Sequence, residues 1–147
     1  MIFTRRRNLN IQSFIPKIAN RPIEHKTVTR FLGVLVDDKF TWKQQIAALK
    51  LKMSRYIGIA YKLRSILPIS ARQKIFNSQV QCHLNYCSLV WGTSCKSNID
   101  ALFQTQKKAM RSIMPGHVNY YYKDGVCPSH PKPSFTELNI LTVQNVI

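Results

Sequence analysis

The sequence predicts an α+β fold in which short N-terminal strands are followed by a mainly α-helical bundle of three helices. Before position 40, β-branched and aromatic residues occur in short runs separated by turn-forming residues. Between positions 42 and 113, apolar residues recur at spacings of three and four, the period of an amphipathic helix. We therefore expect strands within 1–40, a three-helix bundle within 41–114, and a loop with a short helix within 115–147.

The N-terminal segment contains three candidate strands. Residues 1–4 and 11–18 are rich in Ile and Phe with partial alternation, and 28–36 is the strongest candidate because Val and Phe dominate it. Gly33 within this third strand permits a close approach of another backbone. The run Asp37-Asp38-Lys39 then predicts a turn between the last strand and the first helix.

The first helix is expected from position 42 to the Leu67-Pro68 step. Thr41 followed by Gln44 has the form of a capping box, which is a start signal for a helix. The apolar stripe of this helix consists of Trp42, Ile46, Leu49, Met53, Ile57, Ala60 and Leu63. At about 100° per residue, three cations fall on the opposite side and face solvent or a polyanion, namely Lys52, Arg55 and Lys62.

Two further helices are expected after short connections. The second spans 70–91, between a capping box of Ser70 and Gln73 and the C-terminal signal Gly92. Its apolar stripe consists of Ile75, Phe76, Val80, Leu84, Cys87 and Trp91. The third begins near Ser97 and carries the stripe Ile99, Leu102, Phe103, Met110 and Ile113. Because each stripe must be buried, the three helices are predicted to pack against one another.

The C-terminal residues show weaker patterns. Residues 115–133 have no hydrophobic periodicity and are predicted to form a loop. A final short helix or turn is expected within 134–146, where Phe135, Leu138 and Leu141 lie three residues apart.

The charge balance indicates the class of partner. The chain carries 22 Lys and Arg against 6 Asp and Glu, a formal net charge of +16 with a pI of about 10.2. A polyanion would relieve the mutual repulsion of these cations by releasing its condensed counterions. Nucleic acid is the first candidate, an anionic membrane surface the second, and an ordinary basic protein with solvated lysines the third. The sequence contains no apolar run of about 18 residues and no recognisable leader. The chain is therefore expected to be intracellular, either nuclear or cytoplasmic, and to have no membrane partner. The sequence does not predict its oligomeric state.

Basic residues interleaved with aromatic residues are the positive signal for nucleic acid. Besides Lys52, Arg55 and Lys62, the third helix carries Lys107, Lys108 and Arg111, and Tyr120 to Tyr122 form an aromatic run. Cations would contact phosphates and exposed rings would stack on unpaired bases. For Tyr56 and Tyr61, packing at the edge of the stripe is the favoured alternative, and for the three cations of the third helix a solvated face is equally consistent.

Chemistry is not predicted for this chain. Asp37 and Asp38 are the only adjacent carboxylates, and a two-metal site needs a further acid near them. We favour a role in the turn, where their charge suits a helix N-terminus. Cys127 and His130, with His117 and the cysteines Cys82, Cys87 and Cys95, lack two clean pairs of zinc ligands. No catalytic residue, metal site or cofactor is therefore expected, and a zinc-stabilised structural protein remains an alternative.

Four ordered segments resemble the reverse transcriptases of non-LTR retrotransposons, particularly the jockey-like type. They are RFLGVLVDDKFTWKQQI from Arg30, YCSLVWG from Tyr86, LFQTQKKAMR from Leu102 and FTELNIL from Phe135. The resemblance implies that Phe31, Leu32 and Gly33 correspond to the primer grip at the palm edge, and that the helices correspond to the thumb. Lys52, Arg55, Lys62, Lys107, Lys108 and Arg111 would then follow the phosphate backbone of an RNA–DNA or DNA duplex.

The resemblance also implies what this chain lacks. The family's Ala-Asp-Asp motif, and the Mg²⁺ that it binds, belong to a palm that would precede Met1, so this chain alone is expected to be inactive. It resembles a fragment of an RNA-directed DNA polymerase that holds the template–primer. The alternatives are a stand-alone basic RNA-binding or zinc-stabilised protein, and a truncated remnant without function.

Overall fold

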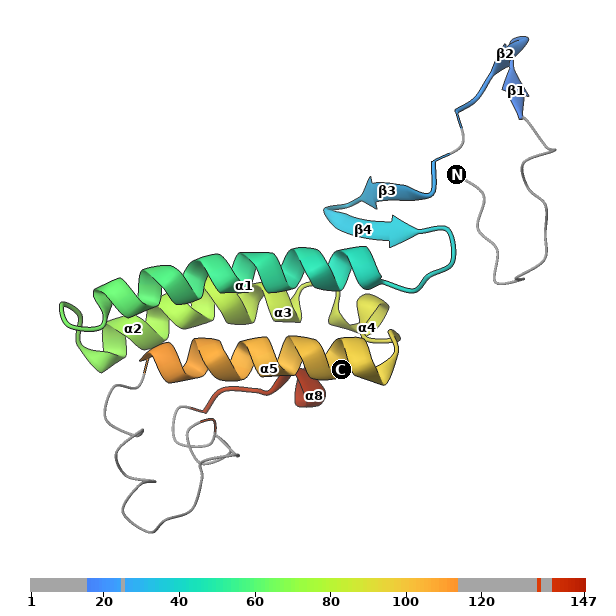
Figure 1. Cartoon of the computed structure of the whole chain (residues 1–147). Coiled ribbons are helices and arrows are strands. Elements are labelled where there is room, and N and C mark those ends of the chain that lie inside the picture. The colour runs from blue at the N-terminus through green and yellow to red at the C-terminus, as the bar shows by residue number, and fades with distance from the viewer. Residues whose placement is uncertain (1–15, 25, 114–134, 136–138) are drawn as a thin grey trace.

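The chain is described from a computed structural model that covers residues 16–24, 26–113, 135 and 139–147. Two small hairpins precede a group of packed helices, as Figure 1 shows. The predicted α+β class, with N-terminal strands before a mainly helical part, is confirmed. The strand expected at 1–4, most of the strand expected at 11–18, and the loop expected at 115–133 lie outside the described residues.

Both hairpins have two-residue turns with positive φ angles. In the first, β1 (Lys17–Ile18) pairs antiparallel with β2 (Arg21–Pro22). In the second, β3 (Val28–Phe31) pairs antiparallel with β4 (Val34–Asp37), with Phe31 opposite Val34. The single strand predicted over 28–36 is wrong, because Leu32 (φ 45°) and Gly33 (φ 82°) turn the chain back. Positive φ at both turn residues matches the twist of the flanking strands.

The first long helix, α1 (Lys43–Leu63), begins without the predicted capping box of Thr41 and Gln44. Asp37 at the end of β4 caps it instead. Its carboxylate accepts hydrogen bonds from the backbone amides of Thr41 and Trp42 and from the Thr41 hydroxyl, each at 2.8 Å. The role predicted for Asp37 in the turn, with its charge at a helix N-terminus, is therefore confirmed.

The second predicted helix is interrupted. The chain instead forms α2 (Ile69–Phe76), the π-helical turn η2 (Asn77–Gln81), α3 (Cys82–Asn85) and α4 (Ser88–Trp91). The break lies at Tyr86, which is extended, and Cys87, which is left-handed with φ 52°. The Trp91 indole N–H donates to the Tyr86 carbonyl at 2.8 Å, which satisfies an acceptor that the broken helix leaves free. The capping box predicted at Ser70 is also absent, since α2 begins after Pro68 without a side-chain cap.

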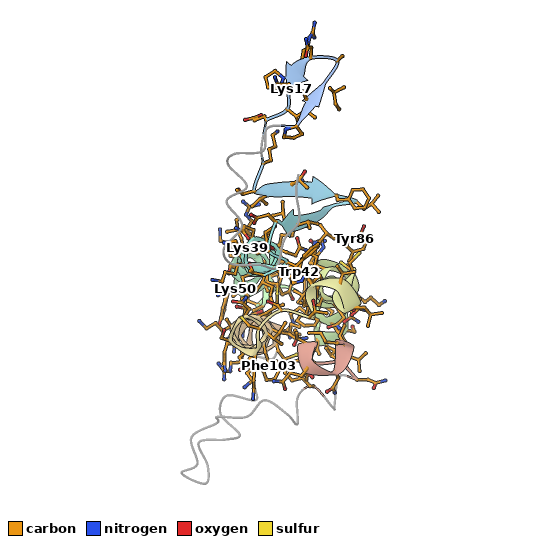
Figure 2. The ribbon with its side chains drawn as sticks, turned by 90° about the vertical axis from the view of Figure 1, so that its right-hand side faces the viewer. Lys17, Lys39, Trp42, Lys50, Tyr86 and Phe103 are labelled. Carbon is orange, nitrogen blue, oxygen red and sulfur yellow. The ribbon has the colours of Figure 1, made fainter. Side chains whose placement is uncertain are left out.

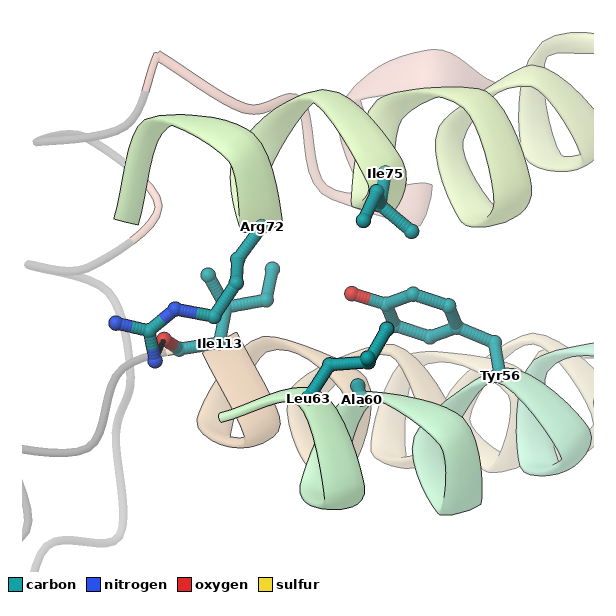
Figure 3. A pocket seen from close by; sticks show the side chains of 6 residues that line it. All are labelled: Tyr56, Ala60, Leu63, Arg72, Ile75 and Ile113. Carbon is teal, nitrogen blue, oxygen red and sulfur yellow. Dashed lines mark hydrogen bonds between the residues drawn. The ribbon is translucent and has the colours of Figure 1, made fainter. Parts of the chain in front are cut away.

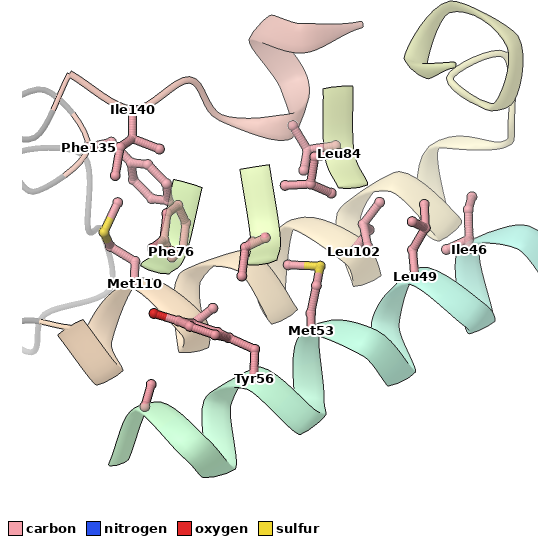
Figure 4. Close-up of a cluster of buried hydrophobic side chains, with 14 of the residues drawn as sticks. Ile46, Leu49, Met53, Tyr56, Phe76, Leu84, Leu102, Met110, Phe135 and Ile140 are labelled. Atoms are coloured by element: carbon pink, nitrogen blue, oxygen red, sulfur yellow. The ribbon is translucent and has the colours of Figure 1, made fainter. Parts of the chain in front are cut away.

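The third long helix, α5 (Lys96–Ile113), packs against α1 and α2. The predicted three-helix arrangement is therefore found, with α2, η2, α3 and α4 together forming a segmented second member. The predicted stripes supply the core: in Figure 4, Leu49 and Met53 of α1 lie near Leu102 of α5, and Phe76 and Leu84 come from the segmented member. Tyr56 is buried, so its predicted packing at the stripe edge is confirmed, whereas the same prediction is wrong for Tyr61, which is 53% exposed. No helix in the described part of the chain is both long and apolar enough to cross a bilayer.

The C-terminal segment packs on α5 through one buried amide. The Gln106 side chain is fully buried, donates to the Leu141 carbonyl and accepts from the Val143 amide, both at 2.9 Å. Within 134–146, where a final short helix or turn was predicted, the described residues include the helix α8 (Val143–Val146). Ile140 and Val143 are buried, whereas Leu141, predicted to lie on the apolar face, is 53% exposed.

Candidate nucleic-acid interface

A groove of about 510 Å³ lies between α1 and the segmented member of the bundle. It is lined by Lys52, Arg55, Tyr56, Ile59, Ile75, Gln79 and His83. Lys52, Arg55 and Ile59 are spaced three and four apart, so they form one strip along α1. Gln79 and His83, four residues apart on η2 and α3, form the other wall. The groove thus combines cations on one wall with an amide and an imidazole on the other.

The electrostatics of the groove favour an anion. None of its seven lining residues is acidic, so the charges of Lys52 and Arg55 are not balanced within it. Burial, and then the positive charge of Lys52, lower the pKa of His83 below its ordinary value. Both effects favour the neutral form of the imidazole in the free chain. Two fixed cations beside a neutral donor–acceptor side chain form a suitable surface for a phosphate group.

The structure brings together some of the predicted cations and separates others. Lys52 and Arg55 share the groove, and Lys62 is exposed further along α1. Lys108 and Arg111 are exposed on α5, whereas the groove-lining residues come from α1, α2, η2 and α3. Lys107 was predicted to be exposed, but it is only 8% exposed, and its ammonium lies 4.4 Å from the centre of the Phe103 ring. Its charge interacts with the face of an aromatic ring, whereas the neighbouring Lys108 is exposed to solvent.

The tip of the second hairpin is exposed to solvent and is held by a contact with Tyr86. Phe31 and Leu32 are 66% and 74% exposed. The Tyr86 hydroxyl donates to the Leu32 carbonyl at 2.6 Å, across 54 positions of sequence. A side-chain carbon added at Gly33 would lie 3.9 Å from the Tyr86 ring, so the ring also packs beside the turn. Figure 2 shows Tyr86 next to this hairpin and on the opposite flank of the molecule from Lys39 and Lys50.

Beneath one end of the groove, the polar groups are structural. The Arg72 guanidinium is buried and donates to the Ile113 carbonyl at 2.6 Å, which caps the end of α5. Burial raises the pKa of Tyr56 to about 12, against the lowering effects of a hydrogen bond with Ser112 and of the Arg72 charge. Figure 3 shows Tyr56, Arg72 and Ile113 around a cavity of about 10 Å³, which is about the smallest volume that holds one water. A ligand has no room there.

The predicted metal candidates are only partly described. Both carboxylate oxygens of Asp37 are engaged at the start of α1. Among the residues that the structure describes, no three His, Cys, Asp or Glu gather as metal ligands would. Cys127, His117 and His130 lie outside the described residues, as does the aromatic run from Tyr120 to Tyr122.

One wall of this groove could not be predicted from the sequence. The apolar stripe of the second predicted helix places Gln79 and His83 only on its polar face. Which polar face meets which other helix depends on packing, and no spacing within one helix encodes it. The contact of Tyr86 with Leu32 was not predictable either, because it depends on the break at Cys87.

Comparison with known proteins gives one informative match. No family model matches the chain, and no solved structure matches it significantly. A curated protein from Drosophila melanogaster, described as a probable RNA-directed DNA polymerase from transposon X-element, is 25% identical over 95 residues. The match covers 63% of this chain and 10% of that protein, so the chain corresponds to a small part of its relative. The similarity supports a relationship between this chain and the reverse transcriptases of transposons.

Proposed function

We propose that this chain holds the phosphate backbone of a template–primer duplex, as the primer-grip and thumb portion of a jockey-like non-LTR reverse transcriptase. In this role the chain binds nucleic acid and leaves the metal-dependent chemistry to a palm. The observation that carries the proposal is the groove in which Lys52 and Arg55 stand without an acidic partner. The similarity to a transposon polymerase supports the same class of partner.

The hairpin tip supports the primer-grip part of the proposal. Phe31 and Leu32 are exposed apolar side chains on a tight turn that Tyr86 holds in place. Gly33 adopts a φ of 82° and has no side chain, so a sugar–phosphate backbone can approach the turn closely. Lys62, Lys108 and Arg111, which are exposed on α1 and α5, would add contacts along a longer duplex.

Binding to an RNA–DNA hybrid duplex at several salt concentrations tests the proposal. If about four phosphates are neutralised, the logarithm of the binding constant falls with the logarithm of salt concentration at a slope near −4. Fluorescence anisotropy of a labelled hybrid measures this slope. Replacing Lys52→Ala together with Arg55→Ala is expected to reduce its magnitude by about 2, since each lost phosphate contact contributes about 1. A slope that does not change would contradict the proposal.

A matched control lies on the same helix. Lys43 and Lys50 are seven residues apart, so they share a strip of α1, and Lys50 is about 200° around the helix from Lys52. Lys43→Ala with Lys50→Ala removes the same charge without altering the groove, and should reduce the slope less than the groove variant does. Equal losses in the two variants would mean that net charge, and not the groove, determines binding.

The proposal also assigns the chemistry to another part of the polymerase. We expect no nucleotide incorporation when the pure chain is mixed with primer, template, deoxynucleotides and Mg²⁺. Incorporation that disappears in Asp37→Asn would overturn this part of the proposal.

A further inference from the structure

His83 stands on the wall of the groove opposite the two cations. Lys52 and Arg55 belong to α1, whereas His83 belongs to α3. Lys52 is close enough for its charge to disfavour protonation of the imidazole. The other titratable group in the groove is Tyr56, and Ile59, Ile75 and Gln79 are uncharged. In the free chain, two cations and a histidine therefore surround a space in which no lining carboxylate balances them.

A phosphate group would reverse this balance. Its negative charge, placed between Lys52 and His83, attracts a proton to the imidazole and at the same time screens the imidazole from the lysine. The neutral imidazole has one N–H donor, whereas the protonated imidazole has two. A phosphodiester is an acceptor only, so the protonated form makes the stronger hydrogen bond to it.

We propose that His83 is a phosphate-binding residue of this groove that takes up one proton from solvent when a nucleic-acid phosphate enters between His83 and Lys52. One N–H bond forms on the imidazole as one O–H bond of a hydronium ion breaks and releases water, and the new N–H donates to a phosphate oxygen. The inference rests on the proposed function and adds a residue and a pH response to it.

The consequence is that affinity for nucleic acid rises as pH falls. For one linked proton, the rise is at most about tenfold per pH unit, between the pKa of His83 in the free chain and its higher pKa in the complex. Lys52→Ala removes a charge that lowers the free pKa, so it shifts the pH response to higher pH as well as weakening binding.

The experiment compares two variants with complementary histidines. The chain has four histidines. Replacing His25, His117 and His130 by Gln leaves His83 as the sole imidazole, while His83→Gln leaves the other three. Anisotropy with a labelled RNA–DNA hybrid is measured for both variants between about pH 8 and pH 5, the range in which histidine titrates. In parallel, the proton NMR signal of the single imidazole is titrated with and without the unlabelled hybrid.

The inference predicts that the variant with His83 alone binds more tightly as pH falls and that its imidazole titrates at higher pH in the complex. The affinity of His83→Gln for the hybrid should rise less steeply as pH falls. Equal pH responses in both variants, or an unchanged imidazole pKa while the hybrid is bound, would overturn the inference and leave the proposed function standing. Absence of binding at every pH would overturn both.

Discussion

Both carboxylate oxygens of Asp37 accept hydrogen bonds from the start of α1, so one side chain joins β4 to the bundle. Burial alone would raise the pKa of this carboxyl, but the hydrogen bonds from the Thr41 and Trp42 amides and from the Thr41 hydroxyl outweigh burial and lower it. The charged form is thus favoured in the folded chain. The Trp42 ring that follows is only 5% exposed, and its indole N–H donates to the Thr93 hydroxyl at 3.1 Å.

Asp37→Asn tests this cap. The amide loses the charge and can accept fewer of the three hydrogen bonds, so we expect the free energy of unfolding at neutral pH to fall by about 1–2 kcal/mol. A carboxyl with a lowered folded pKa contributes stability above its ordinary value of 3.8, and this contribution is lost as pH falls through the lowered value. The difference between wild type and variant should therefore persist down to about pH 4 and shrink below it.

Urea unfolding at a series of pH values measures the difference. Asp38→Asn is the matched control, because Asp38 is the neighbouring carboxylate and the cap bonds go to Asp37. It should change stability by no more than a few tenths of a kcal/mol. A variant of Asp37 as stable as the wild type at neutral pH would show that the first turn of α1 does not need this carboxylate.

The hairpin of β3 and β4 is joined to the bundle by polar contacts as well as by the buried Val34 side chain. The Leu35 amide donates to the Gln45 side chain at 3.0 Å, and the Tyr86 hydroxyl donates to the Leu32 carbonyl at 2.6 Å. The second contact joins two of the segments that resemble reverse transcriptases, and Gln106 joins the other two through its bond to the Leu141 carbonyl. The four segments thus meet in pairs in the folded chain.

Tyr86→Phe removes only the hydroxyl that holds the hairpin tip. Because Tyr86 is half exposed, we expect a local effect of about 0.5–1.5 kcal/mol, seen as faster amide hydrogen exchange in β3 and β4 with little change in α1 and α5. Tyr61→Phe is a close control, since Tyr61 is 53% exposed and Tyr86 is 52% exposed. Exchange rates in the hairpin that match the wild type would mean that the hydrogen bond does not restrain the tip.

The helical elements were predictable where periodicity alone determines burial. Met53, Leu84 and Leu102 lie in the predicted stripes and are fully buried. The break at Cys87 was not predictable, because the freed carbonyl of Tyr86 is satisfied by the Trp91 indole, a contact that exists only after the chain has turned. The burial of Lys107 was not predictable either. It depends on the long aliphatic part of the side chain, which lets the ammonium lie over a neighbouring ring. The groove depends on how two helices pack, so only its α1 wall was foreseen.

The net positive charge that suits the chain for binding a polyanion also opposes its folding. With 22 cations and 6 acids, bringing the chain together increases the mean repulsion among its charges. Salt screens this repulsion, with a Debye length of about 10 Å at 0.1 M. The free chain should therefore become more stable as salt is added, while its affinity for nucleic acid decreases.

Thermal unfolding in sodium chloride measures this opposition. We expect Tm to rise with salt, and for a chain of this size a gain of about 1 kcal/mol corresponds to roughly 3 °C. Replacing Lys43→Glu with Lys50→Glu changes the formal charge by −4, from +16 to +12, so this variant should unfold at a higher temperature in low salt and respond less to added salt. Since both lysines lie off the groove, its binding to a hybrid duplex should keep the dependence on Lys52 and Arg55. A Tm that falls as salt is added would mean that attraction within ion pairs outweighs repulsion among the cations. The excess positive charge would then not explain the binding of a polyanion.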